Sequence, residues 1–134
     1  MPLTARVALL LLLFVAPALA AGAPAISEDQ PMRVMVVRSN EAGCEPTCTS
    51  WISAEGRITN QTPAAFRRVL KEIGKAKMPV FINSGGGDVD ASLAIGRLIR
   101  ARGLDIAVSR TAFAPCLAGN RDCDEKTGKG RSTG

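Results

Sequence analysis

The sequence predicts an α/β domain, because strand-like and helix-like segments alternate along most of its length. Two segments place apolar residues at helical spacing with basic residues on the opposite face, at 62–75 and 89–102. Short apolar runs rich in β-branched residues flank them, at 32–37, 51–58, 78–83 and 104–109. The order strand, strand, helix, strand, helix, strand favours a sheet with parallel pairing through crossover helices.

Local residue types support each element. The strand at 51–58 is expected to bend at Gly56, since glycine in a strand marks a bulge or bend. The first helix is expected to have Thr62 as its N-cap and Pro63 at its first position, and to close at Gly74. The run at 78–83 is almost wholly apolar, as in a buried parallel strand.

The second helix is expected to end at Gly103, because glycine readily adopts the left-handed conformation there. Its buried face is predicted to hold Leu93, Ala94, Ile95, Leu98 and Ile99. These elements give a domain over 32–114, preceded by a flexible lead-in at 21–31. Residues 115–134 are polar and predict a Cys-bounded loop or a disordered tail.

The N-terminus has the three parts of a secretory signal peptide. Arg6 precedes the apolar run 7–15, and Pro17 breaks the helix before a small-residue motif ending in Ala18 and Ala20. We expect cleavage after Ala20, since a spanning helix needs about 20 apolar residues. Retention of the segment as a membrane anchor is the alternative. After cleavage, the product is expected to be periplasmic or secreted. It is not expected to be an integral membrane protein.

Charge and aromatic content weigh against a nucleic-acid partner. The chain has 17 basic and 12 acidic residues, a net charge of +5. The basic residues lie at intervals typical of solvated helix faces, and with no Tyr and one Trp a base-stacking surface is not expected. A solvated basic face on the helices is therefore a simpler interpretation of these residues than a nucleic-acid site.

The four cysteines form two close pairs, Cys44 with Cys48 and Cys116 with Cys123. In an oxidising compartment an even number predicts disulfides, and local pairing is the simplest of three connectivities. A zinc site is disfavoured by the spacing and by the absence of His. A redox pair is disfavoured because neither pair is Cys-x-x-Cys. We therefore expect no metal and no cofactor.

The segment from Phe81 to Asp90 combines a buried strand, a glycine turn and a helix start. Its glycines allow positive φ and close approach, and its amides suit an anion or a developing oxyanion. It departs from a P-loop, having no Lys-Ser/Thr, and from a dinucleotide fingerprint, having Asp90 at the third position. A plain tight turn with Asp88 and Asp90 capping the helix is the alternative.

The residues 82–89, Ile-Asn-Ser-Gly-Gly-Gly-Asp-Val, resemble the Clp-protease proteolytic-subunit and crotonase superfamily, in particular its exported bacterial members. The resemblance covers about 51–109. It implies a partial crotonase-like spiral of ββα units. It also implies an oxyanion half-site at Gly86 and Gly87, with Gly87 favoured as the donor and Gly85 in place of the usual Pro.

The same resemblance implies serine-peptidase or acyl-transfer chemistry, a peptide or other acyl substrate, and a homo-oligomer. The family's nucleophilic Ser and its His follow the strand that corresponds to 104–109. Here that region holds the Cys-bounded loop; Ser132 is the only later serine, and the 134 residues contain no His. We therefore expect an incomplete catalytic site, with the chain truncated inside a cysteine-containing insertion. The alternatives are a small disulfide-pinned binding domain of the envelope and, less favoured, an anion-binding turn.

Overall fold

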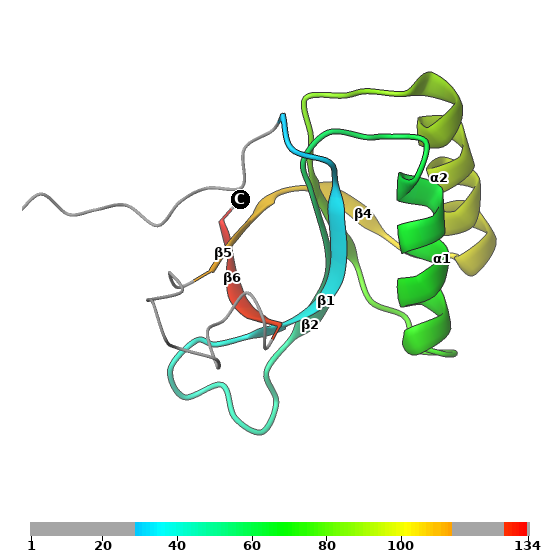
Figure 1. The fold of residues 1–134 in the computed structure, drawn as a ribbon. Helices are drawn as coiled ribbons and strands as arrows, with labels where there is room; N and C mark the ends of the chain where they lie inside the picture. The colour runs from blue at the N-terminus through cyan, green and yellow to red at the C-terminus, as the bar shows by residue number, and fades with distance from the viewer. Residues whose placement is uncertain (1–28, 114–127, 134) are drawn as a thin grey trace, which may run out of the picture.

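A computed structural model describes residues 29–113 and 128–133, which form one curled sheet with two helices packed on its outer face (Figure 1). The helices are α1 (Thr62–Glu72) and α2 (Val89–Arg102). The strands are β1 (Arg33–Ser39), β2 (Ser50–Glu55), β3 (Val80–Asn83), β4 (Ile106–Val108), β5 (Arg110–Ala112) and β6 (Lys129–Thr133). The predicted α/β class is confirmed at this level.

The sheet has the strand order β4-β3-β2-β1-β6-β5. β1 and β2 are antiparallel, whereas β2, β3 and β4 run parallel through α1 and α2. The prediction of parallel pairing through crossover helices is therefore confirmed. The bend expected after the second strand is present, since β2 ends at Glu55 and Gly56 has a φ of 113°.

The prediction of an irregular tail is wrong for Lys129–Thr133, which forms β6. This strand pairs in parallel with β1 and antiparallel with β5. Only Ser109 separates β4 from β5, so the chain turns the far end of the sheet back towards β1 and β6, and the sheet curls into a ring (Figure 1). Backbone pairing stabilises this strand although most of its side chains are exposed.

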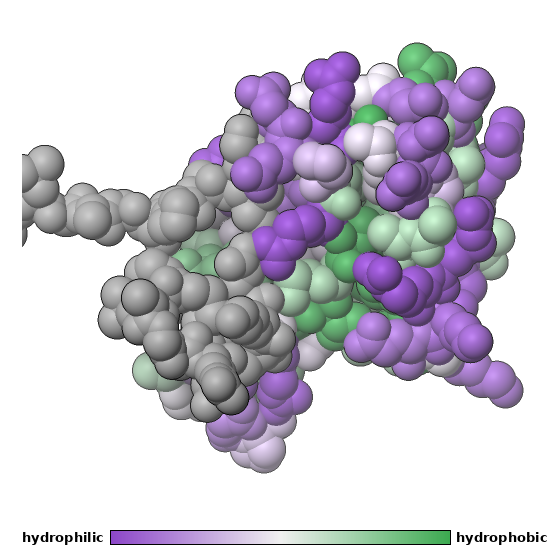
Figure 2. Space-filling model, viewed as in Figure 1, coloured by the Kyte–Doolittle hydropathy of each residue, from purple (hydrophilic) through white to green (hydrophobic). Residues whose placement is uncertain are grey.

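The main apolar core lies between the helices and the outer face of the sheet. Phe66, Val69 and Leu70 of α1 pack with Ile95 and Ile99 of α2 against the buried face of the sheet. Hydrophilic residues cover the outside of the helices in Figure 2, and apolar surface shows where the helices meet the sheet. The predicted burial of Leu93 is wrong, because its side chain is 52% exposed.

The helix ends differ partly from the prediction. α1 begins at Thr62 and has Gln61 as its N-cap residue, without a side-chain cap. The Thr62 hydroxyl instead accepts a hydrogen bond from the Thr59 amide at 2.9 Å, so its prediction as N-cap is wrong. α2 agrees with expectation: Asp88 caps it by accepting from the Ala91 amide at 2.8 Å, and Gly103 ends it with a φ of 58°.

Contacts between the helix ends fix the helices to each other. The Arg102 guanidinium donates to the carbonyl oxygen of Leu70 at 3.2 Å and to that of Gly74. These carbonyls lie at the end of α1, where a positive charge is favourable to the helix dipole. In the part of the chain that is described, neither helix is long and apolar enough to cross a membrane. The predicted signal segment lies outside the described residues.

Candidate functional site

The predicted glycine turn connects β3 to α2 and is held in a conformation that strongly favours glycine. Gly86 has a φ of 109° and Gly87 a φ of 144°, both in the region that L side chains rarely enter. A Cβ atom on Gly87 would lie 2.0 Å from the Ile58 carbonyl oxygen. The residues after β2 therefore press directly against the turn.

Two hydrogen bonds fix this contact. The Ile58 amide donates to the Gly86 carbonyl oxygen at 2.9 Å, and the Asp88 amide donates to the Ile58 carbonyl oxygen at 3.0 Å. Ile58 and Gly87 form a parallel bridge in which Ile58 supplies both bonds. In such a bridge the partner's own amide and carbonyl point the other way. The N–H and C=O groups of Gly87 are therefore directed away from Ile58, and the residue is exposed.

The two glycine amides of the predicted half-site are not equivalent. The Gly86 amide donates to the Ser84 hydroxyl at 3.2 Å. Within the described residues the Gly87 amide donates no hydrogen bond. The Gly87 amide is therefore a donor that points away from Ile58, beside the N-terminus of α2. The role of Gly86 and Gly87 as an oxyanion half-site stays a prediction.

A polar network centred on the buried Glu55 lies next to the turn, at the end of β3. The Glu55 carboxylate, 3% exposed, accepts from the Asn83 side-chain amide at 2.9 Å and from the Thr111 backbone amide at 2.6 Å. The Trp51 indole donates to the Thr111 hydroxyl at 3.0 Å. Glu55 thus links β2, β3 and β5 inside the ring. No pattern in the sequence indicates this network, because Asn83 and Thr111 lie 28 and 56 residues from Glu55 along the chain.

Ser132, which is not expected to act as a nucleophile, lies on β6. Its hydroxyl is 2.7 Å from the hydroxyl of Ser109, between β4 and β5. A serine nucleophile needs an adjacent base, and a second hydroxyl does not take that role at neutral pH. The contact therefore joins two parts of the ring and assembles no catalytic pair by itself.

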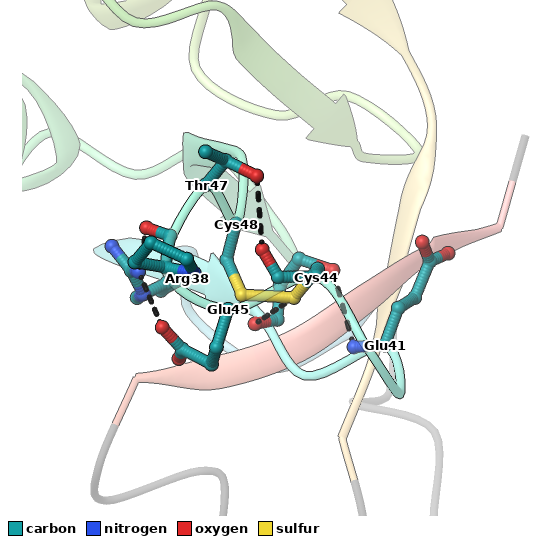
Figure 3. The surroundings of a disulfide bond; sticks show 8 residues. Arg38, Glu41, Cys44, Glu45, Thr47 and Cys48 are labelled. Carbon is teal, nitrogen blue, oxygen red and sulfur yellow. Dashed lines mark hydrogen bonds and ion pairs between the residues drawn. A yellow bond between two sulfur atoms is a disulfide. The ribbon is translucent and has the colours of Figure 1, made fainter.

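The predicted disulfide between Cys44 and Cys48 is present and closes the loop between β1 and β2 (Figure 3). Arg38 at the base of the loop contacts the Glu45 carboxylate and the Pro46 carbonyl oxygen, each at 2.9 Å. The Glu41 side chain points away from the disulfide in Figure 3. The predicted pair of Cys116 and Cys123 lies outside the described residues.

A cavity of about 270 Å³ opens beside this loop. Trp51 and Phe81, with ring centroids 5.5 Å apart, and Pro79 supply its apolar lining. Glu41 and several hydroxyl groups supply its polar lining: Ser39, Thr49, Ser50 and Ser132. The arrangement suits a small apolar group that carries a hydrogen-bond donor.

Among residues 29–113 and 128–133, no group of three or more potential metal ligands lies together. No family model, curated protein or solved structure matches the chain. The resemblance to the Clp-protease and crotonase superfamily therefore stays a prediction, as does the spiral that it implies.

Proposed function

We propose that this chain is an exported Clp-protease-like domain that binds a backbone carbonyl oxygen of a peptide, or of another acyl compound, at the Gly87 amide. The observation that carries this proposal is the bridge to Ile58. It fixes the turn so that the Gly87 amide points away from Ile58. A side chain at this position is excluded, because a Cβ atom on Gly87 would lie 2.0 Å from the Ile58 carbonyl oxygen. A fixed, exposed amide is the element that an oxyanion site requires.

A neutral oxygen is favoured over an anion at this turn. Asp88 and Asp90 lie at the start of α2, beside Gly87. Their negative charges repel a phosphate or carboxylate, whereas a carbonyl oxygen carries only a partial charge. The Asp88 carboxylate is also occupied by the cap of α2. The ligand class that follows is a neutral peptide or acyl group.

We propose that the chain binds the peptide or acyl group and that its own 134 residues do not hydrolyse it. The 134 residues contain no histidine, so they cannot supply a Ser-His pair by themselves. We expect a fluorophosphonate probe to leave the chain unlabelled. Labelling that disappears in Ser132→Ala would contradict this part of the proposal.

Binding is tested by fluorescence anisotropy of a labelled, N-acetylated and C-amidated apolar hexapeptide. The proposal predicts saturable binding that excess unlabelled peptide reverses and that equimolar phosphate leaves unchanged. Displacement by phosphate would favour the anion-binding alternative. Absence of binding at millimolar peptide would contradict the proposed function.

A disulfide-pinned interaction domain is the second candidate, and the cavity beside Cys44–Cys48 favours it. The disulfide is also compatible with export, since such bonds persist in oxidising compartments. Intact-mass analysis of the product expressed with its N-terminus tests export directly. We expect a chain that begins at residue 21; a chain retaining residues 1–20 in the membrane fraction would contradict cleavage.

A further inference from the structure

Among the described residues, four large apolar side chains are exposed, and all of them belong to α2 and β4. They are Val89 and Leu93 on α2, 72% and 52% exposed, and Ile106 and Val108 on β4, 55% and 86% exposed. Single exposed apolar residues are ordinary on protein surfaces. These four instead belong to two consecutive elements at the free end of the strand order. We call them the β4 edge.

The side chains of β4 divide between the two faces of the sheet. Ile106 pairs with Val80, which is buried in the core under the helices, and Val108 pairs with Ile82, which packs against that core. Paired residues of neighbouring strands share a face. Ile106 and Val108 therefore lie on the face that carries α2, while their exposure shows that α2 leaves them partly uncovered.

The backbone of β4 has one bonded side and one open side. Val80 donates to the Asp105 carbonyl oxygen at 2.8 Å, and Ser109 donates to the Ile82 carbonyl oxygen at 3.1 Å. Alternate residues of a strand direct their backbone groups to opposite sides. The amide and carbonyl groups of Ile106 and Val108 therefore point away from β3, along an edge that no other described strand occupies.

We propose that this edge binds a second copy of the chain, with the two β4 strands antiparallel about a two-fold axis through Ala107. This register places Ile106 opposite Val108 of the other copy, and Val108 opposite its Ile106. Both residues have outward backbone groups, so each pair forms a reciprocal pair of hydrogen bonds. The exposed apolar side chains then meet on one face, and the two sheets become continuous.

The proposed two-fold axis also brings together opposite charges on the α2 helices of the two copies. The N-terminal end of α2 carries Asp88 and Asp90, and its C-terminal half carries Arg97 and Arg100. A two-fold axis perpendicular to the sheet makes the two α2 helices antiparallel on the same face. The acidic end of each helix then faces the basic half of the other, and the helix dipoles also oppose favourably.

Sedimentation velocity of the full chain over a wide concentration range tests this interface. We expect a dimer that dissociates on dilution. In Val108→Lys the lysine of each copy would lie opposite Ile106 of the other copy, so two positive charges would be buried in the apolar contact. The dissociation constant should then rise on the order of 100-fold or more. Ala64→Lys, at an exposed position on α1, is the control and should sediment like the parent chain. A parent chain that is monomeric at every concentration overturns the proposal.

A cysteine at Ala107 tests the register even if the lysine variant folds poorly. Residues at the two-fold axis form a non-hydrogen-bonded pair, with Cβ atoms about 4.5–5.5 Å apart. This spacing is close to that of a disulfide. Ala107→Cys should therefore give a disulfide-linked dimer on mild oxidation, seen on a non-reducing gel, whereas Ala64→Cys should not. Equal cross-linking of both variants would overturn the proposal. Cross-linking of neither variant would also overturn it, and is the result expected if a different protein covers this edge.

Discussion

Glu55 shows how one side chain connects distant parts of this chain. Its carboxylate is buried and accepts hydrogen bonds from the Asn83 side chain and the Thr111 backbone amide. Both donors would be left without an acceptor if the carboxylate were removed. Each such loss costs about 1–3 kcal/mol in a buried setting. Glu55 therefore holds β5 across the ring against β2 and β3.

We predict that Glu55→Leu lowers the free energy of unfolding by about 3 kcal/mol, because the buried Thr111 amide and the part-buried Asn83 side chain lose their acceptor. Urea unfolding followed by fluorescence measures this, since Trp51 is the only tryptophan and is 3% exposed. Glu72→Ala, at an exposed position on α1, is the control and should change stability by less than about 0.5 kcal/mol. Equal effects of the two variants would contradict the role of Glu55.

The glycines allow a second comparison between single residues. Gly87→Ala should destabilise the chain by about 3 kcal/mol or more, because the added Cβ meets the Ile58 carbonyl oxygen at a positive φ. Gly96→Ala lies inside α2 with no atom near the added Cβ, and should stabilise it by about 0.5–1 kcal/mol. Thermal unfolding of both variants separates the two effects. A Gly87→Ala variant as stable as the parent would show that the turn is not fixed by Ile58.

At the scale of elements, the cap of α2 gives a direct test. Asp88→Ala removes the side-chain bond to the Ala91 amide and should lower stability by about 1 kcal/mol. Asp88→Asn keeps an acceptor at this position and should recover most of the loss. Urea unfolding distinguishes the variants. If Asn and Ala are equally destabilising, the negative charge matters more than the hydrogen bond.

The elements that the sequence predicts well are those with a local cause. Apolar periodicity is sufficient to locate both helices, and Gly103 and Asp88 mark the ends of α2 through short-range geometry. β6 has no such local cause: its polar residues form a strand because β1 and β5 pair with its backbone. Helical spacing alone predicts Leu93 in the core, yet α2 packs through Ala91, Ile95 and Ile99 and leaves the Leu93 side chain exposed.

The candidate site likewise has one part with a local cause in the sequence and another part that depends on distant contacts. The glycine turn is recognisable in the sequence because Gly85, Gly86 and Gly87 stand together between a strand and a helix. The resemblance already favours Gly87 as the donor, but the direction of its amide depends on Ile58, which is distant in the chain and reaches the turn only in the folded sheet. The link from Glu55 to Thr111 likewise depends on the return of β5, which no spacing in the sequence indicates.

At the scale of the whole molecule, the described sheet ends at β4 in an exposed apolar edge, and a disulfide closes the loop between β1 and β2. If β4 pairs with a second copy, folding and association are linked, and stability depends on concentration. The melting temperature of the parent chain should therefore rise with protein concentration. Val108→Lys should remove this dependence while Ala64→Lys retains it. A concentration-independent melting temperature of the parent would contradict the dimer.

The proposed contact between the Gly87 amide and the carbonyl oxygen of a neutral peptide can be observed directly. The most direct measurement is the ¹⁵N-resolved NMR spectrum of the chain during titration with the N-acetylated, C-amidated hexapeptide. We predict that the Gly87 amide proton shifts downfield on saturation, with the Gly86 amide much less affected because Ser84 already accepts its hydrogen bond. Peptide binding that leaves the Gly87 signal unchanged, or no binding, would contradict the account.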